Sequence, residues 1–153
     1  QFDMVRSGIG MYGFANDAAL QPNLTPIMAL KSVISQIHTL QVGDSLGYNR
    51  GYIADHITKT ATIPVGHADG INRIYGKGKG FVFIHGKKAP ILGNVCMDML
   101  MADLGEIPAK EGDEGIIFNS CKTLEEFAEY CQTIPYEVLT SISRRVKRIY
   151  VKD

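Results

Sequence analysis

The chain has 153 residues, 45% of them hydrophobic, and its 16 basic side chains balance its 16 acidic ones. This length suits one domain with a buried core, while the neutral balance and the lack of a long apolar run give no reason to expect binding to nucleic acid or a membrane. Three cysteines and four histidines without metal-ligand spacing argue against a metal site and predict reduced thiols in a cytoplasmic protein.

The first third of the chain is divided by glycines and prolines. Residues 1–16 predict a short buried segment followed by glycine turns, and residues 17–26 predict a loop. Residues 27–40 fit both a helical stripe and a strand; we favour a strand, because Val42-Gly43-Asp44 then closes it as a hairpin turn. In the next stretch Tyr48 lies between two glycines, where a tyrosine either packs its ring on a sheet or presents its hydroxyl to a pocket.

The middle of the chain predicts further strands. Residues 52–65 predict the clearest one, with Ile57 and Ile63 on one face and the threonines 58, 60 and 62 on the other. A glycine-punctuated loop follows up to residue 80. Residues 81–92 predict a hairpin about His85-Gly86-Lys87-Lys88, and residues 95–104 and 112–118 predict two more apolar segments.

One helix is expected near the carboxyl end. Thr123 and Glu126 form a capping-box pattern with Thr123 as N-cap, and Pro135 is expected to stop the helix. The tail 143–151 alternates apolar and basic residues and predicts an edge or closing strand. Together the elements predict a mainly β, barrel-like domain with one clear helix near residues 123–132.

Two basic segments are assigned no chemistry. The loop Gly76-Lys77-Gly78-Lys79-Gly80 lacks the spacing of a P-loop and precedes a strand, which indicates a solvated hairpin loop. The basic tail suits a solvated strand face, or pairing with acidic neighbours, better than phosphate binding.

Five segments are more informative together than singly. They are VRSGI at 5–9, GYNRGY at 47–52, IPVGHADGINR at 63–73, LGNVCMDM at 92–99 and TIPYEVL at 133–139. In this order, over nearly the whole chain, they resemble the carboxy-terminal part of alanine racemase, a bacterial pyridoxal-phosphate (PLP) enzyme. The resemblance implies that residues 1–16 end the PLP-binding barrel and that residues 17–153 form the carboxy-terminal β domain.

The resemblance also implies roles on the substrate side. Tyr48 takes the place of the tyrosine base that acts on the L-alanine face. Met97 stands where a backbone N–H meets the substrate carboxylate, and Asp98 lies next to it. Arg73 and Ile134 correspond to the narrow entrance of the pocket.

On the cofactor side, Arg6 matches the arginine that faces the pyridine nitrogen of PLP. Gly8 and Ile9 match backbone amides on the phosphate, and Tyr136 matches a tyrosine that reaches it. The family works as a homodimer in which the β domain of one subunit covers the partner's barrel. Its reaction interconverts L- and D-alanine for cell-wall peptidoglycan.

Two departures from the family pattern matter. His67 stands where the family usually has a tyrosine at the entrance, which puts substrate preference in question. The PLP lysine, expected in a VKA-like motif followed by AYG, does not occur in these residues. We therefore expect the chain to be a piece of a longer enzyme and to be inactive alone. That enzyme could also be fused to a cell-wall ligase.

Two alternatives remain open. One is a racemase for another amino acid, such as serine or lysine, which His67 at the entrance would permit. The other is a barrel-shaped binding module without catalysis, for nucleic acid or protein. The neutral charge and few exposed aromatic pairs disfavour a nucleic-acid surface.

Overall fold

The computed structural model describes residues 3–15 and 17–151, and in this part of the chain it has nine strands, two α-helices and five short 3-10 helices. The elements in chain order are η1 (Ile9–Tyr12), η2 (Gln21–Asn23), β1 (Leu30–Val33), β2 (Gln36–Leu40), β3 (Ser45–Leu46), η3 (Tyr48–Arg50), β4 (Tyr52–Ile53), β5 (Thr58–Ile63), η4 (His67–Asp69), η5 (Arg73–Tyr75), β6 (Phe81–Ile84), β7 (Lys87–Leu92), β8 (Leu100–Asp103), β9 (Glu114–Phe118), α1 (Cys121–Tyr130) and α2 (Pro135–Ser141).

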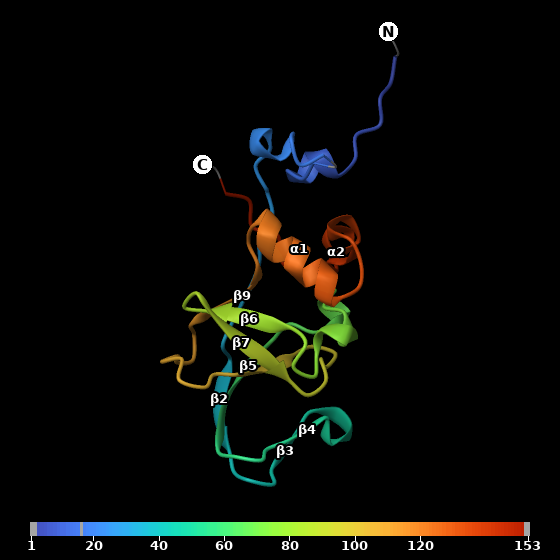
Figure 1. Ribbon diagram of the computed structural model, residues 1–153. Coiled ribbons are helices and arrows are strands. Elements are labelled where there is room, and N and C mark those ends of the chain that lie inside the picture. The colour runs from blue at the N-terminus through green and yellow to red at the C-terminus, as the bar shows by residue number, and fades with distance from the viewer. Residues whose placement is uncertain (1–2, 16, 152–153) are drawn as a thin grey trace.

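Seven strands form one antiparallel sheet in the order β1-β9-β6-β7-β8-β5-β2. Consecutive strands β1 and β2 lie at opposite ends of this order. The backbone changes partner between them, where Ile34 N–H donates to Asp113 O (2.8 Å) and Ser35 N–H donates to Thr62 O (2.9 Å). The sheet therefore curls into a half-barrel (Figure 1), which confirms the mainly β prediction. The single strand expected over 27–40 is two strands with different partners.

The hairpin predicted over 81–92 is confirmed as β6 and β7. Its turn has two residues, His85 (φ 50°) and Gly86 (φ 75°), both in the left-handed region that a tight type I′ turn requires. The strand expected at 112–118 is confirmed as β9, and β8 occupies the end of the apolar segment 95–104.

The predicted two-faced pattern of β5 is wrong in detail. Thr58 and Thr60 are buried (2% and 1% exposed), whereas Ile57 is 65% exposed. Burial is tolerated because both hydroxyls are hydrogen-bonded, Thr58 Oγ1 to His56 O (3.1 Å) and Thr60 Oγ1 to His38 O (3.5 Å).

The carboxyl end has two helices instead of one. Helix α1 begins at Cys121, and its N-cap is Ser120, not Thr123, because Ser120 Oγ accepts from Thr123 N–H (3.3 Å) while Thr123 Oγ1 accepts from Ser120 N–H (3.0 Å). Pro135 does not stop α1, which ends at Tyr130; it starts α2, since proline suits the first turn of a helix. Figure 1 shows both helices over one end of the sheet.

Tyr75 anchors η5 to this core. It is fully buried, its ring centroid lies 4.3 Å from that of Phe127 on α1, and its hydroxyl donates to Phe81 O (3.0 Å). Burial raises the pKa of Tyr75 above its ordinary value of 10. This anchor fixes the loop that carries Arg73 and Lys77.

Two terminal predictions are wrong. Met4 and Val5 are 77% and 82% exposed rather than buried, since no described element covers them. Residues 1, 2 and 16 of the predicted segment lie outside the described residues. Positions 143–151 form no strand; instead the Arg148 guanidinium donates to the carbonyls of Ile142, Ser143 and Val146 and holds this segment in turns.

Candidate functional site

Tyr48 opens a left-handed turn between two glycines. Gly47 has φ 75°, and Asn49 and Arg50 have φ 57° and 51°. Asn94 secures the turn: its Nδ2 donates to Tyr48 O (2.9 Å), and a Cβ on Gly51 would lie 2.6 Å from that nitrogen. The Tyr48 side chain is thereby kept out of the core and is 62% exposed.

Tyr48 and Met97 line the same hollow, of about 300 Å³. A tight turn, closed by the Cys96 N–H donating to Met99 O (2.9 Å), presents Met97 there. Over residues 3–15 and 17–151, neither the Tyr48 hydroxyl nor the Met97 N–H has a hydrogen-bond partner in the protein. Residues with a free phenol and a free backbone donor therefore line the same hollow. Its lining is Gly47, Tyr48, Cys96, Met97, Asp98, Met99 and Met101.

The loop around η4 holds the Met97 turn in place through backbone hydrogen bonds. His67 N–H donates to Cys96 O (2.9 Å) and Ala68 N–H donates to Met97 O (3.0 Å). Gly66 packs so tightly that a Cβ there would lie 2.4 Å from both carbonyl oxygens. The structure thus places His67 beside the Met97 turn, with its side chain exposed.

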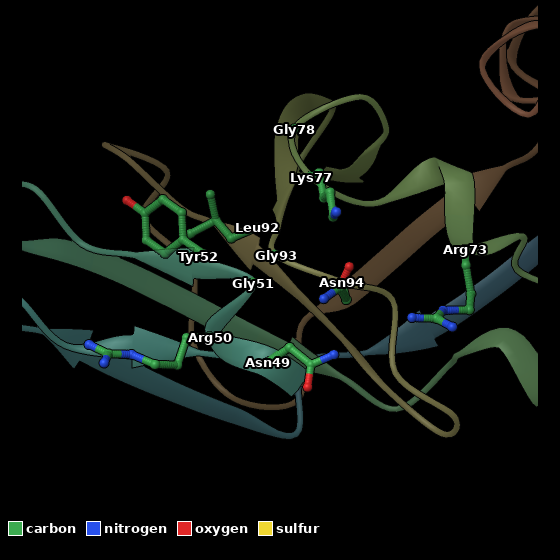
Figure 2. A pocket seen from close by; sticks show the side chains of 10 residues that line it. All are labelled: Asn49, Arg50, Gly51, Tyr52, Arg73, Lys77, Gly78, Leu92, Gly93 and Asn94. Atoms are coloured by element: carbon green, nitrogen blue, oxygen red, sulfur yellow. The ribbon is translucent and has the colours of Figure 1, made fainter.

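The residues that follow Tyr48 in its turn line a second groove, of about 660 Å³ (Figure 2). Arg50, Arg73 and Lys77 border it, and within the described residues none of the three forms an ion pair. Such a groove attracts anions, including carboxylates. The groove is lined by Asn49, Arg50, Gly51, Tyr52, Arg73, Lys77, Gly78, Leu92, Gly93 and Asn94.

Asp69 is the buried charge of the site, 8% exposed. Its Oδ2 accepts from Gly66 N–H (2.8 Å), and Arg145 donates to both carboxylate oxygens, Nε to Oδ1 at 2.7 Å and Nη2 to Oδ2 at 3.1 Å. Burial alone would raise the pKa of Asp69, but the bonds from Arg145 and Gly66 outweigh it, and the pKa lies below its ordinary value of 3.8.

This lowered pKa makes the stability that Asp69 provides depend on pH. The contribution is complete above pH 3.8 and is lost as pH falls through the folded-state pKa, because the unfolded carboxylate binds its proton first. We expect Asp69→Asn to lower the free energy of unfolding by roughly 2 kcal/mol at pH 7. The difference should shrink below pH 3.8 in urea titrations. A difference that stays constant down to pH 2 would contradict this explanation.

The remaining predicted residues lie in a second cluster. Arg6, Gly8 and Ile9 line a groove of about 470 Å³. The ring centroid of Tyr12, in η1, lies 6.2 Å from that of Tyr136 at the start of α2. Ile134 is the N-cap of α2, two residues before Tyr136, and is 62% exposed. In Figure 1 the segment 3–15 lies at the opposite end of the molecule from η3, which carries Tyr48.

The structure therefore divides the predicted site in two. Tyr48, Met97, Asp98 and His67 meet at one place with Arg73 nearby, whereas the predicted cofactor residues and Ile134 lie around α2 and the amino-terminal segment. Among described residues no hydrogen bond or shared pocket joins Ile134 to Arg73.

Sequence reasoning gave no role to Asn94, Lys77 or Arg145. Asn94 belongs to a quoted motif, but nothing local shows that it would hold the Tyr48 turn, 46 positions away. Arg145 lies in a segment for which the sequence predicts a strand, and its partner Asp69 lies 76 positions away. The basic tail was the available signal for Arg145, since pairing with acidic residues was one interpretation of it.

A family model described as alanine racemase, C-terminal domain, matches residues 27–150. The chain belongs to the alanine racemase family. It is 38% identical over 161 residues to alanine racemase 2 of Bacillus subtilis (strain 168), which covers 99% of this chain and 41% of that protein.

Solved structures agree with this assignment. The crystal structure of alanine racemase from D-cycloserine producing Streptomyces lavendulae has a TM-score of 0.87 and 35% identity, over 99% of this chain and 42% of that one. The racemase from Bartonella henselae, which has covalently bound pyridoxal phosphate, has a TM-score of 0.84 and 31% identity, over 94% and 40%. The chain thus spans about two fifths of the length of the alanine racemases it matches, and it corresponds to their C-terminal domain.

The racemase domain has no helix in its described residues that is long and apolar enough to cross a membrane. Within residues 3–15 and 17–151 it also has no group of three or more His, Cys, Asp or Glu side chains arranged for a metal ion.

Proposed function

We propose that this domain is part of a PLP-dependent alanine racemase that interconverts L- and D-alanine in the cytoplasm, for peptidoglycan synthesis. Residues 1–16 would end the PLP-binding barrel, and residues 17–153 would form the carboxy-terminal β domain. The observation that carries the proposal is that Tyr48 and Met97 line one hollow, while among the described residues neither the Tyr48 hydroxyl nor the Met97 N–H has a hydrogen-bond partner.

The residues of the hollow divide the work of racemisation. Tyr48 acts on the L-alanine face: its phenolate oxygen accepts the proton from Cα, and its phenol returns a proton in the reverse direction, while a base outside these residues serves the opposite face. The Met97 N–H binds the substrate carboxylate and so fixes which face Cα turns to the phenol. The neighbouring cationic groove, bordered by Arg50, Arg73 and Lys77, draws the carboxylate towards the site.

The second cluster fits PLP by the chemistry of its donors. Arg6 is a guanidinium that does not give up its proton, so it would face the pyridine nitrogen and leave that nitrogen unprotonated. The backbone amides of Gly8 and Ile9, with the Tyr136 hydroxyl, suit a phosphate group, and the Tyr12–Tyr136 ring contact supports their assignment to one place. PLP, when bound, supplies delocalisation of the negative charge left at Cα.

The two clusters support a homodimer. The element η3, which carries Tyr48, and the segment 3–15, which carries Arg6, lie at opposite ends of the molecule (Figure 1), so one copy does not bring them into the same active site. In a head-to-tail dimer the Tyr48 hollow of one subunit covers the cofactor end of the other. Each active site then uses residues of two chains.

This proposal predicts that the 153-residue chain, purified and supplied with PLP, does not racemise L-alanine and forms no covalent PLP adduct. The reason is that the lysine which would hold PLP is expected outside these residues. The full-length parent should be active in the same coupled assay for D-alanine and show the absorbance of bound PLP. Turnover by the chain alone, or an inactive parent, would refute the proposal.

A further inference from the structure

The guanidinium of Arg145 joins two carboxylates that lie on different loops. It binds Asp69 through Nε and Nη2, and the same Nη2 donates to Asp98 Oδ1 at 2.5 Å. Asp69 is buried, whereas Asp98 is exposed and borders the Tyr48 hollow. One side chain thus ties the interior of the η4 loop to the residue that follows Met97.

The contacts of Asp69 extend this tie to Met97 itself. The Asp69 carboxylate accepts a hydrogen bond from the Gly66 N–H. The N–H groups of the next two residues, His67 and Ala68, donate to the carbonyls of Cys96 and Met97. The Met97 peptide is therefore held from both sides, by backbone bonds from the η4 loop and by the Arg145–Asp98 contact.

The tail that carries Arg145 is itself fixed against the η4 loop. Ser143 N–H donates to Asp69 O (3.0 Å), and a Cβ on Gly70 would lie 2.8 Å from Ser141 O. Arg148 donates to the Ile142, Ser143 and Val146 carbonyls, and the Val146 N–H also donates to Ser143 O (3.1 Å), so these backbone acceptors are paired in a segment without regular structure. The position of Arg145 is therefore set by backbone packing.

The charges around Asp98 are the second reason to assign a role to Arg145. In the proposed function the substrate carboxylate binds the Met97 N–H, next to the Asp98 carboxylate. Two neighbouring carboxylates repel each other unless a cation pairs with one of them. Among the described residues, Arg145 is the cation that forms an ion pair with Asp98.

We propose that Arg145 is a positioning residue of the racemase: it orients the Met97 N–H and neutralises Asp98, so that the site accepts the carboxylate of an amino acid. This inference rests on the proposed function. Arg145 touches neither substrate nor cofactor, and it acts through Asp69 and Asp98.

The test compares Arg145→Met, Arg145→Lys and the matched control Arg144→Met in the full-length parent. Arg144 is the exposed neighbouring arginine and forms no ion pair in the described chain. For Arg145→Met we expect the KM for L-alanine to rise roughly tenfold or more, because a displaced donor and an unpaired carboxylate both weaken carboxylate binding. Arg145→Lys should recover part of the loss, and Arg144→Met should behave as wild type.

Two further readouts separate positioning from general stability. Amide hydrogen exchange in residues 66–70 should become faster in Arg145→Met than in Arg144→Met, since the His67 and Ala68 amides report docking of the loop. In an Asp98→Asn background, the KM increase caused by Arg145→Met should be smaller, because the unpaired carboxylate is gone. If Arg145→Met alone folds poorly, Arg145→Lys, which keeps the positive charge beside Asp69 and Asp98, provides the same comparison.

An unchanged KM in a folded Arg145→Met parent would overturn the inference, and so would an increase that the Asp98→Asn background leaves unaltered. Failure of the proposed function is read separately, from a wild-type parent that does not racemise alanine.

Discussion

Replacing Tyr48 with phenylalanine in the full-length parent is expected to lower kcat for L-to-D racemisation by about 10²- to 10⁴-fold, the range for loss of a positioned acid–base group. The change removes one oxygen atom that has no partner among the described residues and belongs to a side chain that is 62% exposed. Stability should therefore stay within about 0.5 kcal/mol of wild type. The loss should fall on kcat more than on KM, because in the proposed function the Met97 N–H still binds the carboxylate.

Tyr130→Phe is the control for this substitution. Tyr130 is partly exposed and packs edge-on against Tyr75 and Phe81, on the helical side of the domain. It should retain wild-type kinetics in both directions. Wild-type kinetics for Tyr48→Phe as well would remove Tyr48 from its proposed role.

Among substitutions that add a single methyl group in the site, Gly66→Ala is expected to be the most damaging. Its Cβ would lie 2.4 Å from the carbonyl oxygens of Cys96 and Met97, which are backbone atoms and cannot rotate away. The Met97 turn must move, at a cost of about 1–3 kcal/mol for overpacking. Urea unfolding of the chain should show this loss, and the parent enzyme should show a raised KM for L-alanine.

Gly10→Ala is the matched control, because a Cβ there has no atom within 4 Å and its backbone is outside the left-handed region. It should leave the free energy of unfolding unchanged within about 0.5 kcal/mol. If Gly66→Ala proved as mild as Gly10→Ala, the tight packing under Met97 would be disproved.

Local signals predicted much of this fold. The β6–β7 hairpin follows from a two-residue turn between apolar runs, and β9 from a short apolar segment after a turn. The helix start was misplaced by three positions, because Ser120 and Thr123 both carry capping hydroxyls and only the structure shows which one has extended backbone. The strand predicted over 143–151 is wrong for a different reason: the residues alternate as in a strand, but within this segment the Arg148 guanidinium binds the Ser143 and Val146 carbonyls.

The sequence motifs predicted which residues belong to the site, but not how these residues lie relative to one another. Tyr48 and Met97 were singled out because their motifs resemble those of alanine racemase, and the structure places them around one hollow. Asn94, Asp69 and Arg145 act through contacts across 46 to 76 positions, which depend on how the sheet curls and where the tail docks. No local pattern encodes such distances. Nor does one indicate that the segment 3–15 and η3, which carry Arg6 and Tyr48, would lie at opposite ends of the molecule.

Subunit complementation tests the central claim most directly, namely that each active site takes Tyr48 from one chain and the cofactor from another. Two inactive forms of the full-length parent, one carrying Tyr48→Phe and the other lacking the PLP lysine, are mixed, refolded together and purified through two different tags. We expect the heterodimer to regain racemase activity, because one of its two sites combines an intact tyrosine with an intact lysine. A heterodimer that forms but stays inactive would contradict it.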